Sequence, residues 1–120
     1  MGNDSELTRY SIDLAVNMVE YFKWLQTEKK EFVMSKQILR SGTSIGANIH
    51  EAYYAVSKPD FISKMQIALK ETSETEYWLI VLEKTGYFDV AFNAVKNQCL
   101  SLKRMLIATL NSSKKANGER

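Results

Sequence analysis

The chain has 120 residues, 45% hydrophobic and 25% charged, which is typical of a single globular domain. Its net charge of +2, from 16 basic and 14 acidic residues, is too small for the concentrated basic surface common in nucleic-acid-binding proteins. The single cysteine, Cys99, excludes an intrachain disulfide and a site of several thiolates. No apolar run approaches the ~18 residues of a membrane span, and the polar stretch 1–7 is unlike a secretory signal, so we expect a cytoplasmic protein without membrane contact.

The first predicted helix covers residues 5–27 and carries apolar residues on two faces. Its main stripe has helical spacing and consists of Leu7, Leu14, Met18, Tyr21 and Leu25. A second group, Ile12, Val16 and Val19, lies almost opposite that stripe. Because a surface helix of a monomer is normally polar there, this group predicts either a subunit interface or a central position of the helix in its bundle.

The second predicted helix covers residues 35–56, with Ser35 as its N-cap. Gly42 and Gly46 lie inside this helix although each glycine costs up to ~1 kcal/mol relative to alanine. Two glycines four residues apart allow another backbone to approach closely, inside the bundle or between subunits. Together with Tyr53 on the same flank, they form a second candidate interface.

The third predicted helix covers residues 58–85 and has clear signals at both ends. Ser57 is its expected N-cap, Pro59 lies in the first turn, and Asp60 completes a short capping box. Gly86 is a suitable C-terminal cap residue. The expected inner stripe is Phe61, Met65, Ala68, Thr72, Thr75, Leu79 and Leu82.

The fourth predicted helix has the most regular apolar pattern of the chain. Its expected inner stripe is Phe88, Phe92, Val95, Cys99, Leu102, Leu106 and Thr109. We expect one domain of residues 1–113, followed by a polar, disordered tail of residues 114–120. Since short connections make successive helices antiparallel, the sequence predicts an all-α, up-down-up-down antiparallel four-helix bundle.

Polar residues share one flank on each of the second and third helices, which we expect to be neighbours. The set comprises Arg40, Ser44, Asn48, Glu51, Glu71, Glu74 and Trp78. Three interpretations stay open: a satisfied network that fixes helix register, an anion or ligand pocket, and a dinuclear carboxylate metal site. The metal site is disfavoured because it calls for two Glu-x-x-His pairs, whereas His50 is the chain's single histidine.

No arrangement of residues indicates catalysis. Cys99 lies on the apolar stripe, where a free cysteine behaves as a small hydrophobic residue, and no glycine-rich phosphate loop is present. The basic residues form small clusters, which are either solvated helix ends or phosphate contacts multiplied in an oligomer. They are Lys29, Lys30, Lys36, Lys103, Arg104, Lys114 and Lys115.

Residues 37–52 read QILRSGTSIGANIHEA. They resemble the signature of a bacterial four-helix-bundle family named for a protein encoded in intervening sequences of 23S rRNA genes. A second similar block runs from Phe61 through Trp78 to Tyr87, and the likeness spans roughly residues 7–110. The resemblance implies a ring-shaped homo-oligomer, a pentamer. It also implies kinship with the accessory variability protein of diversity-generating retroelements, which binds nucleic acid and a reverse transcriptase.

From residues and resemblance together, we expect a non-enzymatic homo-oligomeric scaffold or adaptor without a cofactor. We expect it to bind further copies of itself. We also expect it to bind RNA or DNA weakly through the basic clusters, or to bind a protein partner. The alternative is a ligand- or metal-binding bundle that uses the polar residues between the second and third helices.

Overall fold

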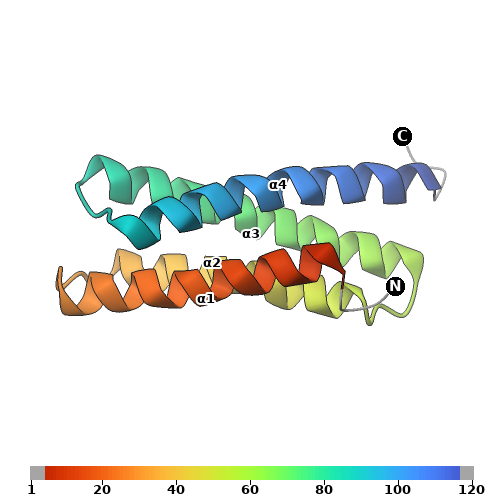
Figure 1. The fold of residues 1–120 in the computed structure, drawn as a ribbon. Coiled ribbons are helices and arrows are strands. Elements are labelled where there is room, and N and C mark those ends of the chain that lie inside the picture. The colour runs from red at the N-terminus through yellow and green to blue at the C-terminus, as the bar shows by residue number, and fades with distance from the viewer. Residues whose placement is uncertain (1–4, 117–120) are drawn as a thin grey trace.

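The computed structural model describes residues 5–116 and shows four helices in antiparallel order (Figure 1). They are α1 (Glu6–Thr27), α2 (Met34–Ala52), α3 (Lys58–Lys84) and α4 (Val90–Ala116). Each helix packs against its two neighbours in the cycle α1–α2–α3–α4, and the diagonal pairs α1–α3 and α2–α4 are not in backbone contact. The predicted up-down-up-down bundle is confirmed, as a rod of 48 × 24 × 20 Å.

Two helices start at a serine that caps the first turn, and the Ser57 cap of α3 confirms the prediction. Ser5 Oγ accepts a hydrogen bond from the Thr8 amide at 3.1 Å, and Ser57 Oγ accepts one from the Asp60 amide at 3.1 Å. The Asp60 carboxylate accepts in turn from the Val56 amide at 3.2 Å. These bonds satisfy amides that have no partner within the first helical turn.

The start of α2 differs from the prediction, because Ser35 is not its N-cap. The Glu31 carboxylate caps this helix instead, accepting from the Val33, Met34 and Ser35 amides at 3.2, 3.1 and 2.6 Å. Ser35 is buried inside the helix, and its Oγ donates to the Glu31 carbonyl at 2.8 Å. A longer acidic side chain thus reaches back over the first turn and takes the capping role.

Two predicted boundaries also shift. Helix α2 ends at Ala52 and not at Val56, because the Ala55 amide bonds the Ala52 carbonyl three residues back and tightens the chain into a turn. Helix α4 continues to Ala116, past the expected domain end at 113, so residues 114–116 of the expected tail are helical. Residues 117–120 of that tail lie outside the described residues.

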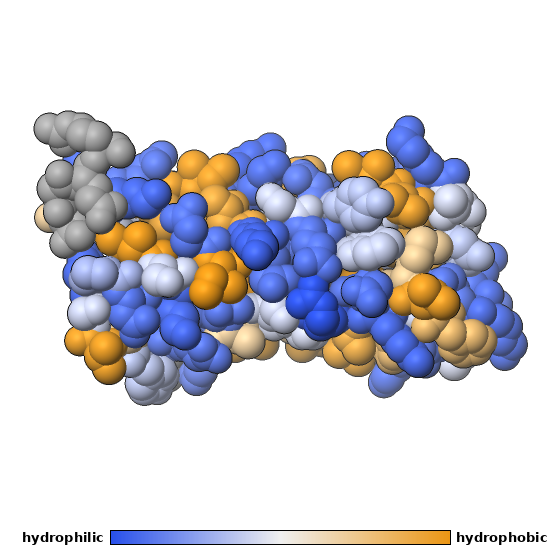
Figure 2. Space-filling view, turned by 180° about the vertical axis from the view of Figure 1, so that it is seen from behind, coloured by the Kyte–Doolittle hydropathy of each residue, from blue (hydrophilic) through white to orange (hydrophobic). Residues whose placement is uncertain are grey.

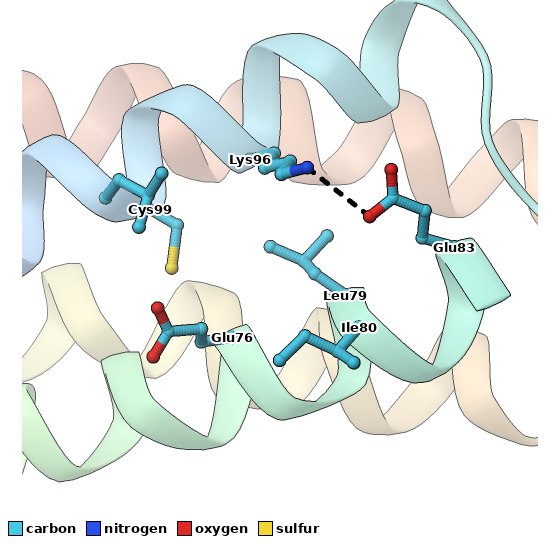
Figure 3. A pocket seen from close by; sticks show the side chains of 7 residues that line it. Glu76, Leu79, Ile80, Glu83, Lys96 and Cys99 are labelled. Carbon is cyan, nitrogen blue, oxygen red and sulfur yellow. Dashed lines mark hydrogen bonds and ion pairs between the residues drawn. The ribbon is translucent and has the colours of Figure 1, made fainter.

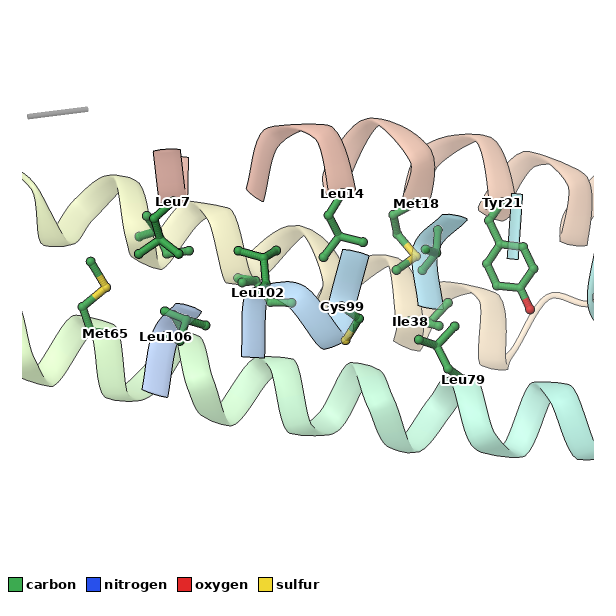
Figure 4. Packing of buried hydrophobic residues seen from close by; sticks show 14 of the residues in the cluster. Leu7, Leu14, Met18, Tyr21, Ile38, Met65, Leu79, Cys99, Leu102 and Leu106 are labelled. Atoms are coloured by element: carbon green, nitrogen blue, oxygen red, sulfur yellow. The ribbon is translucent and has the colours of Figure 1, made fainter. Parts of the chain in front are cut away.

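The core runs along the bundle axis and takes apolar side chains from all four helices (Figure 4). Leu14, Met18, Leu102 and Leu106 have no exposed surface. On α3, Ile62 is buried in place of the predicted Phe61. On α4, Leu110 and Ser113 are buried, whereas the predicted Phe88 and Thr109 are not. Within residues 5–116, no helix is long and apolar enough to cross a bilayer.

Candidate functional site

The strongest polar cluster lies between α2 and α3 and is built on Arg40. Its guanidinium bonds the Glu74 carboxylate and lies 3.4 Å from Glu71 Oε1. Trp78 Nε1 donates to Glu74 Oε2 at 3.4 Å. The hydrogen bond from Arg40 lowers the pKa of Glu74 and raises that of Arg40. Because Arg40 stays 48% exposed, this is a surface ion-pair network that links two helices.

The other predicted members of the polar set do not join this cluster. Ser44 Oγ donates to the Arg40 carbonyl at 2.7 Å, and Asn48 Nδ2 donates to the Ser44 carbonyl at 2.9 Å. Glu51 pairs separately with Lys64 at 3.3 Å. The donors that an anion pocket would use are therefore engaged with the backbone of α2, and the charge of Arg40 is balanced by two carboxylates.

A buried hydroxyl pair beneath Arg40 was absent from the sequence-based set. Thr75 Oγ1 donates to Ser41 Oγ at 2.9 Å and also lies 2.8 Å from the Glu71 carbonyl. Both side chains are fully buried. The available signal was the position of Thr72 and Thr75 on the apolar stripe of α3, since buried hydroxyls are normally hydrogen-bonded.

Neither the histidine nor the cysteine enters a reactive pair. His50 is exposed and packs on the Tyr54 ring, with a centroid distance of 5.2 Å. Cys99 is buried on α4, where desolvation raises the pKa of its thiol to about 12 and keeps it protonated at neutral pH. Among residues 5–116, no group of three or more His, Cys, Asp or Glu side chains is arranged to hold a metal ion.

A small pocket of about 100 Å³ lies between α3 and α4 (Figure 3). The Lys96–Glu83 ion pair, with Nζ and Oε1 3.3 Å apart, closes one side of it, and Leu79 and Ile80 supply its apolar wall. The Cys99 thiol points toward the same space but donates a long contact to the Thr72 carbonyl at 3.7 Å. The pocket is too small for an organic ligand of ordinary size.

The two glycines of α2 lie at a contact with α1 within the chain, which is the first of the two alternatives that the sequence left open. A Cβ at Gly42 would lie 2.5 Å from Met18 Cε, and a Cβ at Gly46 would lie 3.1 Å from Ser11 Oγ. Gly42 is buried, so it offers no surface to a second copy. Tyr53, grouped with the glycines in the candidate interface, is half-buried and packs edge-on against Phe61 at 5.7 Å.

The second apolar group of α1 lies on the surface. Ile12, Val16 and Val19 are 54%, 57% and 36% exposed, on the side of the helix away from the buried Leu14 and Met18. We call these three residues the α1 ridge. Helix α1 is therefore not central in the bundle, and the ridge has no apolar partner among the described residues.

The seven candidate nucleic-acid contacts are dispersed over the rod. Lys29, Lys30 and Lys36 lie at the end where α1 joins α2, whereas Lys114 and Lys115 lie at the far end of α4. Lys103 is paired with Glu76 at 3.0 Å, and the ammonium of Lys29 lies 5.4 Å from the Trp24 ring centre. A single copy thus presents no concentrated basic surface.

The fold and its surface define a small all-α bundle with an exposed apolar ridge on α1 and, within residues 5–116, no group of three or more potential metal ligands. A sequence model of the 23S rRNA-intervening sequence proteins matches residues 3–108, so the chain belongs to that family. The chain is also similar to a crystal structure from Bacteroides thetaiotaomicron, described as a protein of unknown function from the S23 ribosomal protein family. The identity is 50%, over 87% of this chain and 97% of that one, with a TM-score of 0.83. A search of curated proteins gives no match.

Proposed function

We propose that this chain is the subunit of a non-enzymatic, cytoplasmic homo-oligomer that acts as a scaffold or adaptor. The observation that carries the proposal is the α1 ridge, Ile12, Val16 and Val19. Single exposed apolar residues are common on monomers, but three in one stripe opposite a buried stripe are typical of an interaction surface. We assign the ridge to contact with a second copy of the chain, because that partner is present wherever the protein is.

A pentameric ring is the assembly that the family resemblance favours, and it supports a role in weak RNA or DNA binding. Each subunit contributes only small basic clusters, but a ring repeats each cluster once per subunit on the same side. Charges that are too dispersed in one copy then act together on a phosphate backbone, and such binding weakens steeply with salt.

The test of assembly is the mass of the purified protein in solution, measured by light scattering on a size-exclusion column. Val16→Glu places a charge in the centre of the ridge, and we expect it to yield a monomer with an unchanged helical circular dichroism spectrum. Ala47→Glu is the matched control, because Ala47 is exposed on α2, and it should leave the oligomer intact. A monomeric parent protein, or an intact Val16→Glu oligomer, would contradict the proposal.

The nucleic-acid role is tested separately with labelled single-stranded RNA and duplex DNA across a salt series. We expect the association constant to fall linearly with salt concentration on a double-logarithmic plot. Val16→Glu should bind more weakly than the parent protein, since it separates the subunits without removing a basic residue. No binding at low salt removes nucleic acid from the proposal and leaves the scaffold role with a protein partner.

A further inference from the structure

A pocket opens at the end of the rod where α2 joins α3 and where α4 ends, on the right of Figure 1. Its volume is about 430 Å³, compared with about 100 Å³ for the pocket between α3 and α4. Four of the residues that line it have small side chains, which leave the space open: Ala52, Ala55, Ser57 and Ser113. The other lining residues are Tyr53, Lys58 and Phe61. We call this space the end pocket.

Two aromatic rings give the end pocket an apolar wall. Tyr53 and Phe61 pack edge to face with their ring centres 5.7 Å apart, and both side chains are only half-buried. Seen from behind, apolar patches interrupt the hydrophilic surface toward this end of the rod (Figure 2). The volume holds a ligand of about 10–15 non-hydrogen atoms, since a water molecule occupies ~30 Å³ in the liquid. Because ligand pockets are lined mainly by apolar side chains around a few polar groups, this wall suits a ligand with an aromatic body.

A buried hydroxyl faces the end pocket without a partner. Ser113, near the end of α4, is 8% exposed, and its Oγ makes no hydrogen bond within residues 5–116. Every other buried hydroxyl in that range makes one, namely those of Thr8, Ser11, Ser35, Ser41, Thr72 and Thr75. Because buried polar groups are normally hydrogen-bonded and an unpaired one costs stability, Ser113 supplies a polar group that a bound ligand can satisfy.

The charge that lines the end pocket is positive. The Lys58 ammonium lies 5.6 Å from the Phe61 ring centre and has no acidic partner among the described residues. The acid nearest to it in the sequence, Asp60, does not line the pocket, and its carboxylate accepts from a backbone amide at 3.2 Å. Glu51, near the end of α2, is paired with Lys64. The lining therefore carries one positive charge and no negative charge, which complements an anionic group on a ligand.

We propose that the end pocket binds a small organic acid with an aromatic body and one carboxylate. The carboxylate pairs with the Lys58 ammonium, and the body packs against the Tyr53 and Phe61 rings. The Ser113 hydroxyl makes a hydrogen bond to a polar atom of the ligand. This inference goes beyond the proposed homo-oligomer, because no residue of α1 lines the pocket and the α1 ridge lies in the middle of that helix.

The test uses indole-3-acetate as the probe, because it combines an aromatic body, a carboxylate and an N–H donor for Ser113 Oγ. Equilibrium dialysis against the purified protein measures its binding, and we expect one site per chain with a dissociation constant of about 1 mM or lower. Indole-3-acetamide has the same shape without the charge. It should bind about fivefold more weakly, which is the effect of an exposed ion pair.

Variants of the lining residues locate the site. Ala55→Trp fills the end pocket from a half-buried position and should abolish binding of both compounds, with an unchanged helical circular dichroism spectrum. Ala47→Trp, on the exposed side of α2, is the matched control and should bind like the parent protein. Ser113→Ala should weaken binding of both compounds about two- to tenfold, whereas Ser112→Ala, at the exposed neighbouring position, should not.

A charge variant at the surface keeps the test decisive if Ala55→Trp fails to fold. Lys58→Met keeps the length of the side chain, and it should weaken binding of indole-3-acetate about fivefold and leave that of indole-3-acetamide unchanged. Lys115→Met is its control, since Lys115 is exposed on α4 outside the lining. Equal affinity for the two compounds, or unchanged binding of the acid by Lys58→Met, would overturn the assignment to an organic acid. Absence of binding, or binding that survives in a folded Ala55→Trp variant, would overturn the site itself.

Discussion

The two flanks of α2 are held by different physical means. Toward α1, Gly42 leaves space that the Met18 side chain fills, so this flank relies on close apolar packing. Toward α3, the Ser41–Thr75 hydroxyl pair and the Arg40 ion pairs join the helices. Packing sets how near two helices come, and hydrogen bonds require one alignment of donors and acceptors. The first flank therefore fixes distance and the second fixes register.

The largest effect is expected on the packed flank. Gly42→Val places branched carbon atoms where Met18 Cε and Cγ already lie, so we expect a loss of about 1–3 kcal/mol in the free energy of unfolding. Urea denaturation followed by circular dichroism measures this loss. Ala47→Val, on the exposed side of the same helix, is the matched control and should cost only about 0.5 kcal/mol through helix propensity.

A rescue experiment shows whether the Gly42 effect is due to Met18. Adding Met18→Ala to Gly42→Val removes the side chain that the valine strikes, so the double variant should lose less stability than the sum of the single losses. Strict additivity would show that the two residues do not compete for the same space.

A smaller effect is expected for the buried hydroxyl pair on the other flank. Thr75→Val keeps the shape of the side chain but removes the donor to Ser41, and we expect a loss of about 1 kcal/mol. Thr85→Val is the control, because the Thr85 hydroxyl makes the same local bond to the carbonyl four residues back but is exposed. If Thr75→Val and Thr85→Val lose the same stability, the Ser41 link contributes nothing beyond the local bond.

The smallest effect is expected for the exposed ion pairs. Arg40→Gln should cost less than about 1 kcal/mol at neutral pH, because solvent screens charges that are this exposed. The folded-state pKa of Glu74 is lowered from its ordinary value of 4.5. The contribution of the Arg40–Glu74 pair to the free energy of unfolding is therefore complete above pH 4.5 and is lost as the pH falls through the lowered pKa of Glu74.

The measurement compares Arg40→Gln with the parent protein between pH 7 and pH 3. The difference in unfolding free energy should shrink on acidification, as the protonated Glu74 no longer pairs with Arg40. Arg104→Gln is the control, because no acidic partner of Arg104 occurs among the described residues. The difference in unfolding free energy between this variant and the parent protein should not change with pH. If the difference in unfolding free energy between Arg40→Gln and the parent protein does not change with pH, the lost stability comes from side-chain packing and not from charge.

Much of the bundle could be predicted from local sequence patterns. Apolar spacing of three and four residues located the four helices, and Ser57 and Gly86 marked the boundaries of α3 because capping depends on residues within one turn. The start of α2 was misplaced because Glu31 reaches across four residues, and short polar side chains are the usual capping signal. The candidate site was predicted only in part: Arg40, Glu71 and Glu74 meet, but Ser44, Asn48 and Glu51 bond elsewhere.

The sequence by itself determined the helices, their order and which stripe of each faces inward, since these depend on neighbours a few residues apart. Only the tertiary structure decided which side chains meet across helices. Thr75 reaches Ser41 over a separation of 34 residues, and Gly42 faces Met18 of α1. Such pairings depend on the rotation and height of each helix against the others, and the packing of the whole core sets both.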